Sequence, residues 1–88
     1  MDDIHRRDAL QRLASIEGHL RGIRRMIEED AYCVDVLKQT YAVQRAIDRL
    51  EELLLKGHLS SCVPEAFADG RSGQALEELA ELFALARR

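Results

Sequence analysis

Residues 30–64 read DAYCVDVLKQTYAVQRAIDRLEELLLKGHLSSCVP, and they contain the longest helical pattern in the chain. Mostly apolar side chains recur in it every three or four residues, the spacing of a heptad stripe along one face of a helix. The stripe positions are Cys33, Val36, Thr40, Val43, Ile47, Leu50, Leu54 and Gly57. The pattern therefore predicts one helix over residues 31–62, which ends before Pro64 because proline restricts the residue that precedes it.

This predicted helix is too long and too apolar to be covered by its own chain. A second apolar line beside the stripe widens the face that must be buried, at Val34, Leu37, Tyr41 and Leu55. About 28 helical residues span roughly 42 Å, whereas a compact chain of this length has a radius of gyration of about 12 Å. We therefore expect the helix to pack against several neighbours, as in a helix bundle, and expect the chain to oligomerise.

Two further helices are predicted on either side of the long one. Residues 4–28 carry apolar side chains at helical spacing, namely Leu13, Ile16, Leu20, Ile23 and Ile27. Residues 74–86 form the last predicted helix, and the intervening 64–73 is expected to be mostly loop with room for one helical turn. Asp30 is the predicted N-cap of the long helix, and Ser72 is the predicted N-cap of the last one. The fold class is all-α, with three helices in a single domain over residues 1–88.

The composition limits the classes of function. Apolar residues make up 47% and charged residues 33% of the chain, which is typical of a folded globular domain. The net charge of −3 argues against a strongly basic nucleic-acid binder, although the first 25 residues hold six arginines against four acidic residues. We find no signal-peptide pattern and no apolar run long enough to cross a membrane. A cytoplasmic protein with free thiols is therefore expected.

Three side chains with soft donor atoms stand out: Cys33, His58 and Cys62. His58 and Cys62 are four residues apart and lie on one face of a helix. Cys33 is 25 residues before His58, so in a continuous helix it points to nearly the same side but lies roughly 37 Å away. An antiparallel pair of these helices would bring Cys33 of one chain to His58 and Cys62 of the other, twice, in a symmetric dimer.

The chemistry of this set favours a soft metal ion. Two thiolates and an imidazole prefer Cu(I) or Zn(II) to Mg(II) or Ca(II). A closed zinc site would lack a fourth ligand, whereas Cu(I) accepts three. The alternative is structural, because a free cysteine is a common small core residue and a histidine often lies at a helix end.

The sequence resembles the copper-sensing repressors of the CsoR/RcnR type. The resemblance is densest in RLASIEGHLRGIRRMIEEDAYCVDVLKQ (12–39), KGHLSSC (56–62) and DGRSGQALEEL (69–79). It implies a three-helix protomer that forms an antiparallel four-helix-bundle dimer, with dimers paired into a homotetramer. It also implies that the metal-free protein binds operator DNA, and that Cu(I) bound by Cys33 of one chain and His58 and Cys62 of the other lowers this affinity and derepresses copper-resistance genes.

The same resemblance assigns four more residues. Tyr32 and Glu78 match positions that contact the histidine ring or its neighbours, and Arg12 and Arg49 match positions used on DNA. Taken alone, Tyr32 would be explained by ordinary packing, and the other three would be explained as solvated surface residues. The two remaining histidines, at positions 5 and 19, are expected to be exposed polar residues rather than ligands.

Departures from other members of the family favour copper. Nickel sensors of the family use a histidine where this chain has Met1, formaldehyde sensors have a proline where it has Asp2 and Asp3, and persulfide sensors lack the histidine that is present here as His58. A thiol or persulfide sensor, a nickel or zinc sensor and a cytosolic copper carrier stay open as alternatives. A small helical enzyme of the chorismate-mutase kind is not expected, because the arginines mostly lie opposite the apolar stripe.

Overall fold

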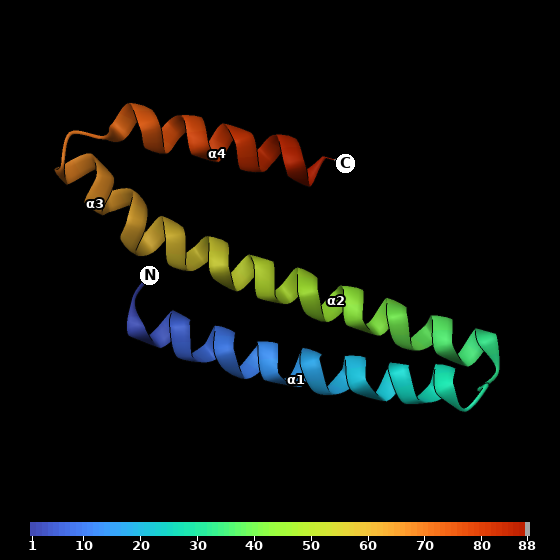
Figure 1. The fold of residues 1–88 in the computed structure, drawn as a ribbon. Helices are drawn as coiled ribbons and strands as arrows, with labels where there is room; N and C mark the ends of the chain where they lie inside the picture. Colours follow the sequence, from blue (N-terminus) through green and yellow to red (C-terminus); the bar gives the residue numbers. More distant parts are fainter. Residues whose placement is uncertain (88) are drawn as a thin grey trace.

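The computed structural model describes residues 1–87, which form helices and no strand. The elements are α1 (Asp3–Glu28), α2 (Cys33–Gly57), the π-helical turn η1 (His58–Cys62), α3 (Val63–Ala68) and α4 (Ser72–Ala86). The residues at the joints of α2, η1 and α3 keep right-handed helical dihedral angles, so these three elements form one continuous rod (Figure 1). The all-α class and the arrangement as three rods are confirmed.

A hairpin of α1 and α2 contains the main core. Ile16 and Ile23 of α1 are buried against Val43 of α2, and Val36, Ala46 and Leu50 pack around them. Two of the five apolar positions predicted for α1 thus face the middle of the heptad stripe. The N-cap of α1 is Asp2, whose carboxylate accepts the backbone N–H of His5 at 2.9 Å.

The turn between α1 and α2 is a Schellman motif, in which a residue with left-handed dihedral angles ends the helix. Asp30 has φ of 56°, its N–H donates to the carbonyl of Ile27, and the N–H of Ala31 donates to that of Met26 at 2.9 Å. The prediction that Asp30 caps the second helix was therefore wrong. The N-cap of α2 is Tyr32, and its side chain makes no capping hydrogen bond.

The long rod does not end before Pro64, contrary to the prediction, but continues to Ala68. In an α-helix the proline ring would meet the carbonyl of Ser60, four residues earlier. The π turn η1 lies there instead, with the N–H of Val63 donating to the carbonyl of His58, five residues back. The carbonyl of Gly57 accepts hydrogen bonds from the hydroxyls of both serines of η1, at 3.3 and 2.7 Å. A wider turn therefore accommodates the proline.

A second Schellman motif turns the chain into α4. Gly70 has φ of 77°, and the N–H of Arg71 donates to the carbonyl of Ala66 at 2.7 Å. The predicted cap at Ser72 was wrong, because Ser72 is already the first residue of α4 and its N-cap is Arg71. From this turn α4 runs back alongside the rod, in the direction opposite to α2 (Figure 1). It packs on α3 and faces α2 across a groove.

The protomer is elongated and incompletely covered. Its radius of gyration is 17.2 Å, against about 12 Å for a compact chain of 88 residues. Within residues 1–87 no large side chain is completely buried, and many leucines, isoleucines and aromatic residues are exposed. The long helix therefore projects beyond any globule that one chain can form, as predicted. No helix in this part of the chain has both the length and the apolar character needed to cross a bilayer.

Candidate functional site

The three soft donors lie at opposite ends of α2 and its continuation. Cys33 is the first residue of α2 and is exposed, whereas His58 and Cys62 are the first and last residues of η1 and are half-buried. The rod is unbroken between them, so its rise of 1.5 Å per residue separates Cys33 from His58 by roughly 37 Å. Accordingly, residues 1–87 of one chain contain no cluster of three candidate metal ligands. Any site that uses all three donors must combine two chains.

The π turn holds His58 and Cys62 close along the helix. A hydrogen bond to the fifth residue back makes this turn wider than an α-helical turn, so it takes more than four residues. His58 and Cys62, four residues apart, consequently lie on one side of the rod within a single turn. The predicted pairing of these two donors on one face is thus compatible with η1, although the turn is not α-helical.

His58 has a buried ring nitrogen without a partner. Its Nε2 makes no hydrogen bond within the described part of the chain. The ring lines the groove of about 530 Å³ between α2 and α4, beside Leu54, Leu55, Leu82 and Leu85. An unsatisfied buried polar atom costs about 1–3 kcal/mol, which a ligand or a hydrogen-bond acceptor would recover. Imidazole is also the most common metal ligand among side chains, so the surroundings of His58 fit a metal-binding role.

The N-terminus of the chain lies beside Cys62, and the first turn of α1 packs against the end of α2. The Cys62 sulfur lies 3.6 Å from the main-chain nitrogen of Met1 and 3.9 Å from the Ser61 hydroxyl. Gly57 favours this close approach, because a Cβ there would lie only 3.2 Å from the Cβ of His5 and would push His5 outward slightly. His5 is half-buried rather than exposed.

Asp2 holds the side chain of His5 in this position. The Nδ1 atom of His5 lies 2.6 Å from a carboxylate oxygen of Asp2. The backbone N–H of His5, together with its ring, lowers the pKa of the Asp2 carboxyl. The expectation that the two remaining histidines are exposed polar residues was wrong, because His5 and His19 are both half-buried.

Tyr32 is far from His58 within one chain, and Glu78 makes no hydrogen bond to the Nε2 atom of His58. Tyr32 directly precedes Cys33 and is exposed, at the far end of α2 from His58. Glu78 lies on α4 and is also exposed. Tyr32, like Cys33, can therefore reach the ring of His58 only when another chain supplies it.

The two predicted DNA contacts come together across the hairpin. Arg12 of α1 and Arg49 of α2 line one hollow of about 240 Å³, together with Ser15, Ile16, His19 and Ala46. Arg12 pairs through its Nε with Asp8 at 3.3 Å. His19 is half-buried, and its Nε2 lies 2.7 Å from the Gln39 side-chain oxygen, which links α1 to α2. Sequence reasoning missed Ser15 and His19, although their spacing from Arg12 places all three on one face of α1.

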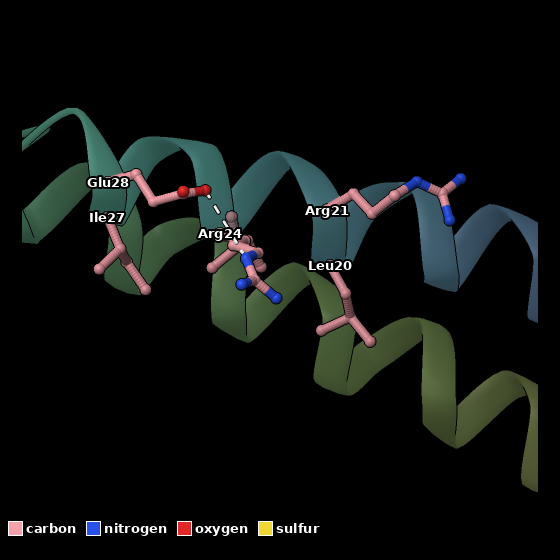
Figure 2. Close-up of a pocket in the computed structure, with 6 residues that line it drawn as sticks. Leu20, Arg21, Arg24, Ile27 and Glu28 are labelled. Atoms are coloured by element: carbon pink, nitrogen blue, oxygen red, sulfur yellow. Dashed lines mark ion pairs between the residues drawn. The ribbon is translucent and has the colours of Figure 1, made fainter.

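The opposite side of the hairpin is apolar. We call this the apolar side and define it by residues that are each at least 38% exposed: Leu13, Leu20, Ile27, Leu37, Tyr41 and Ile47. Figure 2 shows Leu20 and Ile27 extending from the same side of α1, while Arg21 points away from them. Beside them, Arg24 and Glu28 form an exposed ion pair at 3.7 Å. By helical geometry, Cys33 and His58 lie on this side as well, so the candidate ligands share the exposed apolar surface.

The chain is similar in sequence to known metal-responsive repressors. The family model described as "Metal-sensitive transcriptional repressor" matches residues 5–85. The chain is 50% identical over 74 residues to the copper-sensing transcriptional repressor CsoR of Mycobacterium tuberculosis (strain H37Rv), which covers 84% of this chain but only 62% of that relative.

Two solved structures resemble the whole protomer. The copper-sensing repressor CsoR with Cu(I) from Geobacillus thermodenitrificans superposes with a TM-score of 0.90 at 32% identity, covering 100% of this chain and 92% of that one. The nickel-responsive transcriptional regulator InrS superposes with a TM-score of 0.71 at 42% identity, covering 92% and 89% of the two chains. The likeness therefore extends to members that respond to different metals.

Proposed function

The chain belongs to the metal-sensitive transcriptional repressor family, and from this premise we propose that it is a Cu(I)-responsive repressor of operator DNA. The observation that carries the proposal is the position of Cys33 at one end of an unbroken rod, with His58 and Cys62 at the other. Only a partner chain can complete such a site. Action on operator DNA would place the protein in the cytoplasm.

The uncovered surface supports the oligomer that the site needs. A monomeric protein of 10.0 kDa exposes about 5,200 Å², whereas this protomer exposes 6981 Å². The excess, roughly 1,700 Å², is about twice the 800 Å² or so that one partner contributes to a standard interface. We therefore propose an antiparallel four-helix-bundle dimer of two hairpins, and the pairing of two such dimers into a homotetramer.

The positions of the ligands set the register of the dimer. If α2 packs antiparallel to its partner through the apolar side, Cys33 meets residues 58–62 of the other chain only when the two helices cross midway. That midpoint lies near Ile47, which is exposed on the apolar side. The twofold axis therefore passes close to Ile47, and two equivalent copper sites lie at the two ends of the bundle.

At each end, Cys33 of one chain and His58 and Cys62 of its partner would supply two thiolates and an imidazole. Such donors hold Cu(I) in preference to hard ions, and three of them satisfy it without a fourth ligand. Metal-bound histidine usually donates its other ring N–H to a carboxylate or another acceptor. Tyr32, which arrives beside Cys33, and Glu78 of α4 are the proposed partners of that nitrogen.

Copper binding would act by selecting a conformation with low affinity for DNA. A hundredfold loss of operator affinity requires that Cu(I) stabilise this conformation by about 2.7 kcal/mol relative to the other, within the usual range of allosteric coupling. Arg12 and Arg49 would supply phosphate contacts in the metal-free conformation. Loss of those contacts would release the operator and allow expression of copper-resistance genes.

Mixing two inactive variants tests whether the site is shared between chains. Cys33→Ala and Cys62→Ala are each expected to bind Cu(I) weakly against a competing chelator. After joint unfolding and refolding in equal amounts, half of the dimers contain one chain of each kind. Each mixed dimer has one intact site, so the mixture should recover about one quarter of the wild-type copper capacity. A site formed within one chain would recover none.

The regulatory role is tested on DNA from upstream of the chain's own gene. Fluorescence anisotropy of labelled DNA is followed during an anaerobic Cu(I) titration. We expect tight binding of the metal-free protein, and release at about one Cu(I) per chain. Cys33→Ala should bind the DNA but fail to release it. Failure of the wild-type protein to bind this DNA would refute the repressor role and would favour a copper carrier.

A further inference from the structure

The hollow between α1 and α2 has the chemistry of an anion site. Two guanidinium groups, from Arg12 and Arg49, line it together with the hydroxyl group of Ser15 and the imidazole of His19. We infer that this hollow seats one backbone phosphate of the operator, and that Ser15 and His19 contact that phosphate along with the two arginines. The inference rests on the proposed function, because the phosphate belongs to the DNA.

Both helices of the hairpin contribute side chains to this phosphate seat. Arg12, Ser15 and His19 follow one another at intervals of three and four residues and form a single line on α1. Arg49 approaches from α2. Phosphate oxygens accept hydrogen bonds from guanidinium, hydroxyl and imidazole groups alike, and such contacts fix the position of a protein on DNA.

Asp8 holds Arg12 in place through one of its three guanidinium nitrogens. Asp8, one turn earlier on α1, contacts the Nε atom of Arg12 at 3.3 Å. The terminal nitrogens of the guanidinium group are therefore left for a second anion. With an exposed fraction of 44%, the side chain is accessible from solvent. An arginine fixed through Nε presents its remaining donors at lower entropic cost than a free one.

His19 can make the seat sensitive to pH. Its Nε2 hydrogen-bonds to the uncharged amide of Gln39, and the charged side chains around the hollow are Arg12 and Arg49, with Asp8 paired to Arg12. Because Nε2 donates to the Gln39 oxygen, the ring can donate to a phosphate only from Nδ1, and only an imidazolium carries protons on both ring nitrogens. Histidine changes charge between pH 5 and 8, so the operator should bind more tightly as the pH is lowered through this range.

Three single variants test the inference on the full chain. Ser15→Ala should weaken operator binding about fivefold to tenfold, and His19→Gln should weaken it at pH 6 but much less at pH 8. Alanine is the better helix former and glutamine can keep a hydrogen bond to Gln39, so neither change should unfold the hairpin. Arg21→Ala is the matched control on the opposite face of α1 and should leave affinity unchanged. Binding is measured by anisotropy, and folding by circular dichroism.

The dependence on pH separates phosphate contact from a structural role. Wild-type affinity should rise from pH 8 to pH 6, and His19→Gln should abolish most of this rise. Unchanged affinity in both Ser15→Ala and His19→Gln, with normal DNA binding by the wild type, would overturn the inference and leave the repressor role intact. Absence of DNA binding by the wild type would instead refute the proposed function as well.

A second experiment adds inorganic phosphate at constant ionic strength, to distinguish a free phosphate ion from the DNA backbone as the occupant of the hollow. If the hollow takes a free phosphate ion rather than the DNA backbone, the ion should shift the ring resonances of His19 in the absence of DNA, and the variants should bind the operator normally. A seat for the DNA backbone predicts the shift when duplex DNA is added, together with weaker binding by both variants.

Discussion

Replacing Asp30 by glycine should stabilise the protein. The turns after α1 and α3 are the same Schellman motif, with left-handed residues at Asp30 (φ 56°) and Gly70 (φ 77°). Glycine adopts this conformation freely, whereas a side chain places Cβ against the following carbonyl group. The chain thus has glycine at the left-handed position of one Schellman motif and aspartate at that position of the other, so the two turns can be compared directly.

The expected gain follows from two opposing contributions. The left-handed conformation costs an ordinary residue about 1–2 kcal/mol, and aspartate lies at the lower end because it tolerates this region. Glycine loses more backbone entropy on folding, which offsets about 0.5 kcal/mol of the stabilisation obtained by relieving this strain. The net stabilisation by Asp30→Gly is therefore about 0.5–1 kcal/mol per chain. For a domain of this size, it corresponds to a rise in Tm of roughly 2–8 °C.

Thermal and urea unfolding at a fixed protein concentration measure this gain. Two controls bracket it: Gly70→Ala should destabilise the protein by about 1 kcal/mol, and Glu29→Gly, at a right-handed position with φ of −92°, should also destabilise it. Copper-free operator affinity should be unaffected. An Asp30→Gly variant that is no more stable than the wild type would refute the reasoning, since it would show that the Asp30 carboxylate stabilises the turn by as much as the strain costs.

Two further predictions concern the apolar side and the start of α1. Leu37→Glu should place a charge within the proposed dimer interface and reduce the mass found by sedimentation equilibrium toward that of one chain, 10.0 kDa. The control Lys38→Glu, on the outer face of α2, should leave the mass unchanged. Equal masses for the two variants would argue against packing through the apolar side. Because the His5 N–H and ring lower the pKa of Asp2, the cap should stabilise α1 above about pH 4 and lose its effect as the pH falls through this lowered value. Protection of the His5 amide from hydrogen exchange should fall over the same pH range. In Asp2→Asn this protection should not change with pH. If the wild type and Asp2→Asn show the same dependence on pH, the Asp2 cap is not its cause.

The heptad stripe was sufficient to predict the long helix and the consequence of its length. Val43 and Leu50 pack in the core as the stripe requires, and the helix that separates Cys33 from His58 is unbroken. The ends of the predicted helices were less accurate. Asp30 was interpreted as a cap because aspartate is common there, but a left-handed residue that ends one helix can look the same in sequence.

Pro64 shows why local rules failed at the end of the rod. The rule that proline ends a helix assumes a regular α-helix around it. Here the preceding turn is a π turn, in which Ser60 and Ser61 hydrogen-bond to the carbonyl of Gly57. Serine hydroxyls that bond back to a helix carbonyl are known to bend helices, so these two serines were the available signal. The π conformation itself depends on the surrounding packing and is not encoded in hydrophobic spacing.

The basic hollow depends on the rotation of α1 relative to α2. From the sequence, Ser15 and His19 were ordinary polar residues on a helix face, and nothing placed them beside Arg49. The rotation is set by the burial of Ile16 and Ile23 against Val43, which turns one side of the hairpin toward solvent with its arginines. Once this core is known, the hollow and the apolar side follow together as the two opposite sides of the hairpin.

In the proposed dimer, copper bound at the ends of the bundle would influence DNA contacts near its middle by changing the angle at which the helices cross. If two α2 helices cross near Ile47, the proposed ligands lie roughly 20 Å from the pivot, whereas Arg49 lies within about 3 Å of it along the helix. A tilt of about 5° would then move the ligand end of the helix by about 1.7 Å. This movement would change the ligand geometry enough for copper to favour one of the two conformations. Arg12 lies on the other helix of the hairpin, so the same tilt changes the spacing between the phosphate seats of the two chains. Copper would thus bind where a small rotation moves the ligands furthest, and operator affinity would change because the same rotation alters the spacing of the phosphate seats.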